Sequence, residues 1–481
     1  RTARRLVRDL RQREPGGGWT RAALERALEK LAAGGLCARV GDGDPELLYA
    51  RAWAKQAAGA PADEVRHAWR DVLAIGVIGI ATAGFFWRLL AGQIWIPAGG
   101  GDLAQFLYPT YSFAATWWTR GVMPLWNPYL FGGAPFVGDI QSGIFYPLNL
   151  LTFFIASPLT FRDMEYLSVL HFFIAGTGMY AFLRFGNWRL DIRDWKSETL
   201  ASNLSRPAAL AGAIAFEFSD LFITHFGNLN LIAVVAWMPL VLLFYRRAVT
   251  DRRPGFAVVA GVLLAIAFYA GHIQSFLFIL MALGMFAIYF ITQNIRRREF
   301  GIWNTCPCGR RKGLGFGILS LILVAFVAFG LSAPALLPSI EMAQNTARAS
   351  FKYTEAAQYS LPPAELIGLF VPGFFGRGPQ EAWGPWSRVE VGYLGILPLV
   401  LAFLAIVLRR DSVTRFFAAF ALVGFVLALG GYAILHGWLF QFVPVLAPLR
   451  APARFIVLLD FALATLAAFG FDALLHALPR A

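Results

Sequence analysis

Two acidic residues beside glycine form the first group that could carry chemistry. Asp102 follows Gly99-Gly100-Gly101, and Asp139 lies in Gly138-Asp139-Ile140-Gln141. Two carboxylates in one loop could supply a general base and a group that positions an acceptor or holds a divalent metal ion. Either could also be an ordinary turn or cap residue, because Asp is common at such positions. We take Asp102 and Asp139 as the candidate catalytic pair, and the sequence identifies no particular metal.

A second group could bind a substrate, because its members are charged or hydrogen-bonding residues near the ends of apolar segments. Arg450 and Arg454 could stabilise the negative charge on a departing phosphate, or they could be interface anchors that reach toward lipid headgroups. A histidine at such a position could assist the reaction or bond only locally. The candidate substrate-binding residues are Gln141, His225, His272, Gln274, Glu341, Arg450 and Arg454.

Glu217 and Asp220 stand apart because they approach the interior of an apolar segment. An ionisable residue in a membrane is costly and is therefore a functional candidate by default. Glu217 could equally face a wet cavity. A transporter would place such residues near the bilayer midplane, so these two positions keep transport open as an alternative.

The segments that must position all these residues are apolar. The 481-residue chain is 58% hydrophobic and 15% charged, whereas a soluble domain carries about 25% charged residues. A membrane-spanning helix needs about 20 mostly apolar residues. We predict an all-α polytopic membrane protein with about ten transmembrane helices, over residues 71–96, 164–185, 206–222, 229–246, 255–270, 273–293, 313–333, 390–408, 416–433 and 451–473.

Basic residues predict the orientation of these helices. The net charge of +13 comes mostly from short loops, as the positive-inside rule requires, and does not indicate a nucleic-acid partner. The clusters around Arg246, Arg296 and Arg409 fall inside if the N-terminus is cytoplasmic and residues 144–158 are re-entrant or interfacial. A crossing there would put every later cluster outside. Two long outer loops follow, 97–163 and 334–389, with tryptophans suited to contact membrane lipids.

Residues 1–70 differ from the rest and predict a small helical cytoplasmic module, followed by a membrane domain over 71–475. Cys306-Pro307-Cys308-Gly309 resembles half of a zinc site, but no second Cys/His pair follows nearby. We interpret Cys306 and Cys308 as two cytoplasmic thiols. The start at Arg1 and the ending Leu478-Pro479-Arg480-Ala481 suggest a fragment of a longer chain.

A series of short motifs runs through the loops in a fixed order. They are Gly101-Asp102-Leu103, Tyr108-Pro109, Met123-Pro124-Leu125-Trp126-Asn127-Pro128-Tyr129, Gly132-Gly133-Ala134-Pro135, Asp139-Ile140-Gln141-Ser142-Gly143, Phe145-Tyr146-Pro147-Leu148-Asn149, Gly271-His272-Ile273-Gln274, Leu337-Pro338-Ser339-Ile340-Glu341, Tyr359-Ser360-Leu361-Pro362-Pro363, Tyr393-Leu394-Gly395 and Arg450-Ala451-Pro452-Ala453-Arg454-Phe455. In this order, over about residues 75–475, the chain resembles YfhO-like bacterial membrane proteins, whose family is similar to the C-type glycosyltransferases.

The resemblance implies a multi-helix fold in the bacterial inner membrane and a polyprenyl-phosphate-linked sugar donor. It also implies an essential acidic residue in the first outer loop, which maps onto Asp102, with Asp139 as the second acidic position. Acceptors in the wider group are lipids, cell-wall polymers or proteins. Family members are usually longer, and residues 1–70 have no counterpart. We therefore expect a membrane glycosyltransferase; the alternatives are a flippase or transporter for lipid-linked sugars and a non-catalytic partner in envelope assembly.

Overall fold

The computed structural model describes residues 68–97, 99–130, 132–186, 188, 203–296, 314–346, 352–376, 382–384, 388, 390–443 and 449–477. The chain divides into two units, Arg1–Ala74 and Ile75–Ala481. Only residues 68–74 of the first unit are described, so the predicted N-terminal module lies outside the described residues. The pair Cys306 and Cys308 lies outside them as well.

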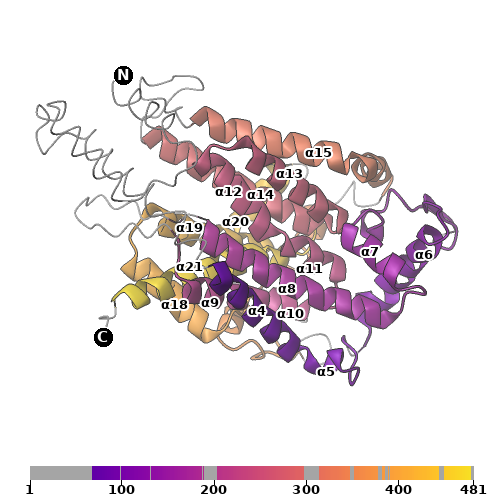
Figure 1. Cartoon of the computed structure of the whole chain (residues 1–481), viewed down its shortest axis with the longest axis horizontal. Helices are drawn as coiled ribbons and strands as arrows, with labels where there is room; N and C mark the ends of the chain where they lie inside the picture. The colour runs from indigo at the N-terminus through magenta and orange to yellow at the C-terminus, as the bar shows by residue number, and fades with distance from the viewer. Residues whose placement is uncertain are drawn as a thin grey trace, which may run out of the picture. The chain divides into compact units, whose positions relative to one another are not determined.

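The second unit is a bundle of helices (Figure 1). Its helices are α4 (Ala68–Phe85, which begins in the first unit), α5 (Trp87–Leu90), α6 (Tyr108–Trp118), α7 (Pro147–Ile155), α8 (Phe161–Phe185), α9 (Arg206–Glu217), α10 (Asp220–Thr224), α11 (Leu229–Ala236), α12 (Met238–Asp251), α13 (Pro254–Tyr269), α14 (Ile273–Arg296), α15 (Leu314–Gln344), α16 (Tyr353–Ala356), α18 (Ile396–Leu408), α19 (Ser412–Ala428), α20 (Ile434–Phe442) and α21 (Ile456–Ala477). Short helical turns are η1 (Leu103–Leu107), η2 (Ile140–Ser142), η4 (Pro363–Leu369), η5 (Gly430–Tyr432) and η7 (Pro452–Phe455). Strands β1 (Trp126–Asn127) and β2 (Ala134–Pro135) pair antiparallel in one small hairpin. The all-α class is confirmed.

Seven helical stretches among the described residues are long and apolar enough to cross a membrane: Ala68–Phe85, Phe161–Phe185, Arg206–Thr224, Leu229–Asp251, Ile273–Gln293, Gly315–Gln344 and Pro452–Ala477. The other three predicted spans correspond to α13, α18 and α19, which have 16, 13 and 17 residues. At 1.5 Å per residue, these three are shorter than the roughly 30 Å hydrocarbon core. The multi-pass membrane class is confirmed. The described residues hold seven candidate spans, and the predicted count of ten is not confirmed.

The core of the unit lies around α21 and the α11–α12 stretch. In each of these two spans 83% of the most apolar window is buried, against 17% for α4 and 28% for α15. Helix α21 packs against α9, α18 and α19, and α8 packs against α9, α11 and α12. Helices α4 and α15 are therefore peripheral, with most of their apolar side chains directed away from the bundle.

The predicted re-entrant segment contains α7, a helix of nine residues. Such a helix is about 14 Å long and is too short to cross the hydrocarbon core. Proline begins the helix, where its missing N–H costs nothing, and the buried Asn149 side chain donates from Nδ2 to the carbonyl of Gly143 at 3.0 Å. Residues 144–158 thus form a short helix that does not span, as predicted.

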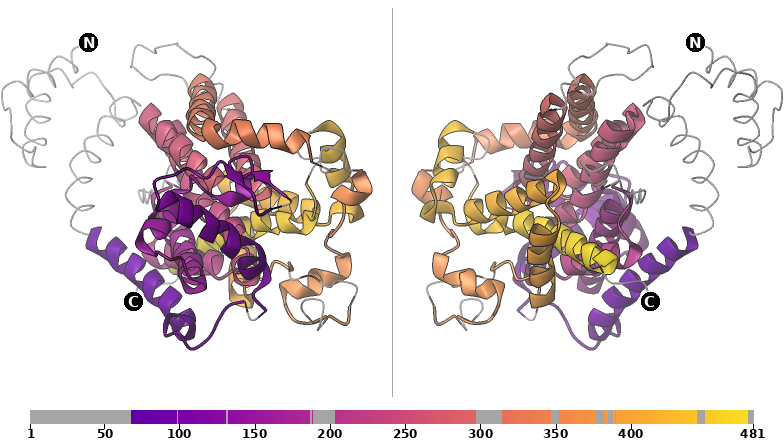
Figure 2. Two further views of the ribbon diagram at one scale, coloured as in Figure 1. Left: turned by 90° about the vertical axis from the view of Figure 1, so that its right-hand side faces the viewer. Right: turned by 90° about the vertical axis from the view of Figure 1, so that its left-hand side faces the viewer.

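The predicted loop that begins at 334 is wrong at its start. Helix α15 continues through Pro334 and Pro338 to Gln344, so Glu341 lies on a helix rather than at the opening of a loop. Proline is tolerated in membrane helices because neighbours satisfy the freed backbone groups. Close to this bend, the Tyr269 hydroxyl donates to the carbonyl of Leu331, one turn before Pro334. Figure 2 shows the later part of α15 turned away from its earlier part, as expected for a proline bend.

The predicted span 390–408 also begins too early. Helix α18 starts at Ile396, because Gly392 and Gly395 adopt φ values of 72° and 100°, which are not helical. Residues 391–393 instead lie against α10. The Asp220 carboxylate accepts hydrogen bonds from the N–H groups of Val391 (3.0 Å) and Gly392 (3.3 Å), and the Asp220 N–H donates to the carbonyl of Tyr393 at 2.9 Å. This attachment places Glu390 beside the end of α10.

Candidate functional site

Glu390 lies at the centre of a group of cationic side chains where α10, α14 and η7 meet the long loops. Its side chain has no exposed surface. Arg388 binds both carboxylate oxygens, with Nη2 2.5 Å from Oε1 and Nε 3.0 Å from Oε2. His225 Nε2 lies 3.5 Å from Oε1, and Arg454 Nε lies 3.7 Å from the same oxygen. We name Glu390, Arg388, His225 and Arg454 the Glu390 cluster.

Helix α10 positions both the acid and the histidine of this cluster. His225 ends α10, and its Nδ1 lies 3.0 Å from the carbonyl oxygen of Leu221. Because a carbonyl only accepts, Nδ1 must carry the hydrogen in this bond. Nε2 can then donate to Glu390 only when the ring is protonated, and in that state His225 and Glu390 form a buried ion pair. Asp220, at the other end of α10, holds the segment that carries Glu390.

The cluster keeps its acid ionised. Burial alone would raise the pKa of Glu390, but the hydrogen bonds and charges of His225 and Arg388 outweigh burial and hold that pKa well below its usual value of 4.5. Burial would lower the pKa of Arg388, but the same contact with Glu390 raises it overall. The two residues therefore form a charged pair across the neutral pH range.

Asp102 lies beside this cluster and is exposed. Its Oδ2 accepts a hydrogen bond from Asn228 Nδ2 at 2.5 Å, and the Asn228 N–H donates to the carbonyl of His225 at 2.8 Å. The charge of Asp102 acts on the guanidinium groups of Arg388 and Arg454. One short turn, 225–228, thus links an accessible carboxylate to the buried ion pairs.

Gln274 and Asn230 connect further predicted residues to the same place. Gln274 Nε2 donates to the carbonyl of Arg450 at 2.8 Å, and its Oε1 accepts from Arg454 Nη1 at 3.2 Å. The charge of the exposed Arg450 side chain acts on Arg454. Asn230 Nδ2 lies 3.4 Å from Gln141 Oε1 and 3.3 Å from the carbonyl of Gly271. Asp102, Gln141, His225, Gln274, Arg450 and Arg454 therefore belong to one neighbourhood.

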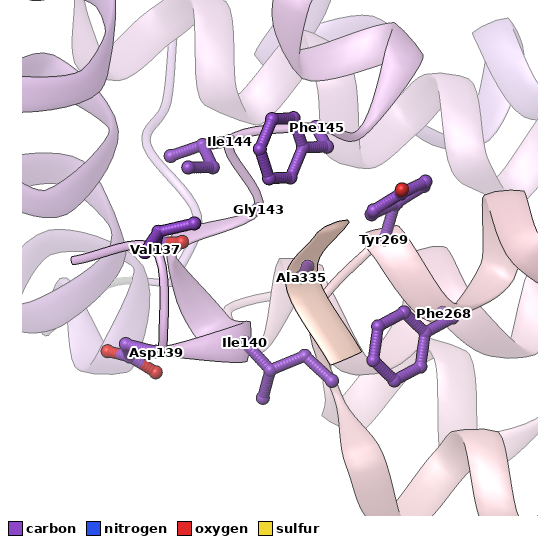
Figure 3. Close-up of a pocket in the computed structure, with 10 residues that line it drawn as sticks. Val137, Asp139, Ile140, Gly143, Ile144, Phe145, Phe268, Tyr269 and Ala335 are labelled. Carbon is purple, nitrogen blue, oxygen red and sulfur yellow. The ribbon is translucent and has the colours of Figure 1, made fainter. Parts of the chain in front are cut away.

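Asp139 is held by a different set of contacts. It caps η2, where its Oδ1 accepts from the Gln141 N–H at 3.0 Å. It lies at the edge of a cavity of about 10 Å³, enough for about one water molecule, with Phe268 and Tyr269 on the opposite side (Figure 3). Burial, with a further contribution from the Asp139 charge, raises the pKa of Tyr111 to about 12. No hydrogen bond joins Asp139 to Asp102, whose side chain binds Asn228, so the catalytic role of Asp139 stays a prediction.

The local contacts of two other predicted residues can be described. His272 Nδ1 lies 2.8 Å from Ser275 Oγ, at the start of α14. Glu341 is exposed on α15, where its carbonyl accepts from Asn345 Nδ2 at 3.0 Å. In the described part of the chain, no three His, Cys, Asp or Glu side chains are grouped in a way that could hold a metal ion.

The sequence reasoning missed Arg388 and Glu390. Opposite charges two residues apart, in a loop otherwise rich in aromatic and apolar residues, were the available signal. The high hydropathy of the following helix outweighs this signal, so the sequence predicts residue 390 as part of the span 390–408.

Comparison with known proteins supplies a family. No curated protein and no solved structure matches the chain. The family model described as "Bacterial membrane protein YfhO" matches residues 144–478. Asp102, Asp139 and Gln141 lie before this range, whereas the Glu390 cluster lies within it. Because the match covers well over half of the 481 residues, the chain belongs to the YfhO family of bacterial membrane proteins.

Proposed function

We propose that this protein is a membrane glycosyltransferase that moves a sugar from a polyprenyl-phosphate-linked donor to a cell-envelope acceptor, with the Glu390 cluster holding the donor phosphate. The observation that supports this most is the charge balance. Arg388 and Arg454 face a single buried carboxylate, and the exposed Asp102 and Arg450 beside them carry opposite charges, so the group retains an excess of positive charge. A bound anion would neutralise that excess.

Arg454 is the residue best placed to meet such an anion. Gln274 binds its Nη1, but its buried Nε, which lies 3.7 Å from Glu390 Oε1, has no hydrogen-bond partner in the described structure. A buried donor without a partner is costly, and a phosphate oxygen would supply the missing acceptor. Arg388 gives its Nε and one Nη2 donor to Glu390 and would contribute mainly charge.

Asp102 would act as the general base. Its carboxylate is accessible and is oriented by Asn228. In the proposed reaction an acceptor hydroxyl gives its proton to Asp102, its oxygen bonds to the anomeric carbon, and the bond from that carbon to the phosphate oxygen breaks. The departing polyprenyl phosphate takes the electron pair, and the nearby arginines stabilise its charge. A lipid, a polymer or a protein could serve as the acceptor.

The test measures consumption of polyprenyl-phosphate sugars by the purified protein in liposomes. Asp102→Asn should lower turnover about 10²- to 10⁴-fold, the usual contribution of a general base, while polyprenyl-phosphate binding is retained. Arg454→Gln should lower turnover and should also weaken polyprenyl-phosphate binding. Asp251→Asn is the matched carboxylate-to-amide control, because Asp251 pairs with Arg247 at the opposite end of the bundle. Equal turnover by wild type and Asp102→Asn would remove Asp102 from the reaction.

A flippase for lipid-linked sugars is the second candidate. Glu217, Asp220 and Asp460 are buried within spanning segments, where ionisable residues often serve transport. A flippase moves the intact donor between leaflets without consuming it. The same liposomes, assayed for donor orientation as well as for donor cleavage, distinguish the two activities.

A further inference from the structure

Glu217 is a buried acid that the proposed sugar transfer does not use. It is the last residue of α9, and its side chain is completely buried. It lies where α4, α8 and α9 meet: Thr82 of α4 contacts one carboxyl oxygen, and Gly176 of α8 lies against the other. A methyl group on Gly176 would overlap with Oε2, so the glycine makes room for the acid.

The hydrogen bonds around Glu217 can be counted proton by proton. Thr82 Oγ1 lies 2.5 Å from Glu217 Oε1 and 2.8 Å from the carbonyl oxygen of Ile78. The threonine has one hydroxyl proton, and the carbonyl has none to give. If Glu217 were ionised, two acceptors would compete for that single proton. If Glu217 is neutral, it donates to Thr82 and Thr82 donates to Ile78, which satisfies both contacts.

No positive charge is available to stabilise an ionised Glu217. Thr82 is its hydrogen-bond partner, Oε2 has none, and no charged group acts on it in the described structure. The buried acids and histidine on the elements packed around it are Glu165 and His171 on α8, Asp220 on α10 and Asp460 on α21, and the histidine is already engaged. The arginines of α4, α8 and α9, which are Arg70, Arg162, Arg184 and Arg206, lie within the first or last turn of their helices. An unpaired buried charge is strongly destabilising, so the neutral acid is favoured.

We propose that Glu217 is an intramembrane proton-binding site, a neutral carboxylic acid whose proton joins α4 to the bundle through Thr82. Helix α4 needs such a contact because it is otherwise peripheral, with only 17% of its apolar window buried. The chain leads from α4 through α5 to Asp102, so the contact also sets where the first long loop begins. This proposal does not depend on the proposed sugar transfer.

Infrared difference spectroscopy of the full chain in lipid nanodiscs at neutral pH tests it. The spectrum of wild type minus Glu217→Gln should contain a carbonyl-stretch band of a protonated carboxylic acid, and the band should shift in deuterium oxide. Asp460→Asn is the control that removes a different buried acid. If the Glu217→Gln variant lacks a carboxylate band that wild type has, and the two spectra do not differ in the carboxylic-acid region, the proposal is overturned.

Thr82 provides a second test that does not require Glu217→Gln to fold. Thr82→Val removes the acceptor of the Glu217 proton, so the Glu217 band should move to higher wavenumber as its hydrogen bond is lost. Thr82→Ser keeps a hydroxyl and should leave the band in place. Identical carboxylic-acid bands in the valine and serine variants would show that Glu217 does not donate to Thr82.

Discussion

At the scale of single residues, Glu390 illustrates how a carboxylate can stay charged without any exposed surface. Arg388 binds both of its oxygens, and His225 and Arg454 approach from other directions. Burying the acid alone would be costly, but the surrounding cations compensate. Removing the acid leaves these cations close together and unpaired. We expect Glu390→Ala to lower the free energy of unfolding by about 3 kcal/mol, the lower part of the range for breaking a buried pair.

The pH dependence of stability offers a sharper prediction for Glu390. Its folded-state pKa lies well below 4.5, so its ionised form stabilises the fold above pH 4.5, and this contribution disappears as pH falls from 4.5 through the lower folded-state value. Wild type should therefore lose more stability than Glu390→Gln between pH 5 and pH 3. Unfolding midpoints in detergent measure this, with the exposed Glu341→Gln as control. Parallel curves for wild type and Glu390→Gln would contradict the prediction.

Sequence patterns predicted some residues of the site but not others, for a physical reason. Asp102, His225 and Gln274 stand at the ends of apolar runs, where a polar residue is conspicuous. Glu390 precedes Val391 and an apolar helix, so hydropathy assigned it to that helix. Only the positive φ values of Gly392 and Gly395 separate Glu390 from α18. The Gly392 conformation depends on packing against Asp220 of α10 and Ile456 of α21, which a single sequence does not display.

At the scale of elements, the segment 391–393 depends on a single side chain of α10. Asp220 accepts from the N–H groups of Val391 and Gly392. Asp220→Ala should leave both groups without this acceptor, at a cost of about 1–3 kcal/mol for the segment. Hydrogen exchange at Val391 and Gly392 should become faster. Asp220→Asn keeps one carbonyl acceptor and should give intermediate exchange. Unchanged protection in the alanine variant would show that another contact holds the segment.

The start of α7 is anchored by a buried chain of polar groups. The Trp237 indole donates to the Tyr146 hydroxyl at 2.9 Å, and that hydroxyl lies 2.7 Å from His171 Nε2. His171 Nδ1 bonds the Leu167 carbonyl, so Nε2 is free to accept. Tyr146→Phe would leave the Trp237 indole without its acceptor and His171 Nε2 without its donor. We expect the free energy of unfolding to fall by about 1–3 kcal/mol. Thermal unfolding compares it with Tyr129→Phe, a matched change at an 81% exposed tyrosine, which should have no effect. Equal unfolding midpoints for Tyr146→Phe and wild type would exclude a stabilising role for the hydrogen bonds of Tyr146.

Element boundaries were harder to predict than element existence. Each predicted span corresponds to an apolar helix, because hydropathy reports burial in lipid or protein directly. The ends are set by local contacts instead. Helix α15 passes through two prolines to Gln344, whereas α4 ends at Phe85, well before the predicted 96. Proline signals an end in water, but in a membrane the helix is kept because no solvent can satisfy a broken backbone.

At the scale of the whole molecule, the order of the helices places two kinds of connection at opposite ends of the bundle. Helices α6 and α7 lie at one end of the bundle (Figure 1). By the order of the helices, the connections that carry the hairpin β1–β2 and the Glu390 cluster belong to the same end. The basic residues in or just after the last turns of α8, α12 and α18, including Arg184, Arg252 and Arg409, belong to the other. The positive-inside rule then predicts that the Glu390 cluster faces the outside of the cell.

Cysteine accessibility tests this orientation in intact cells. Cys37, Cys306 and Cys308 are first replaced by serine. One new cysteine is then introduced in each of two variants, Tyr129→Cys in the hairpin and Arg253→Cys between α12 and α13. Both positions are exposed. A membrane-impermeant maleimide should label Tyr129→Cys in intact cells and Arg253→Cys only after the membrane is opened. The reverse pattern would place the cluster inside. A polyprenyl-phosphate sugar presented on the outer leaflet could then not reach Asp102, so the proposed sugar transfer would have to use a donor from the cytoplasmic leaflet.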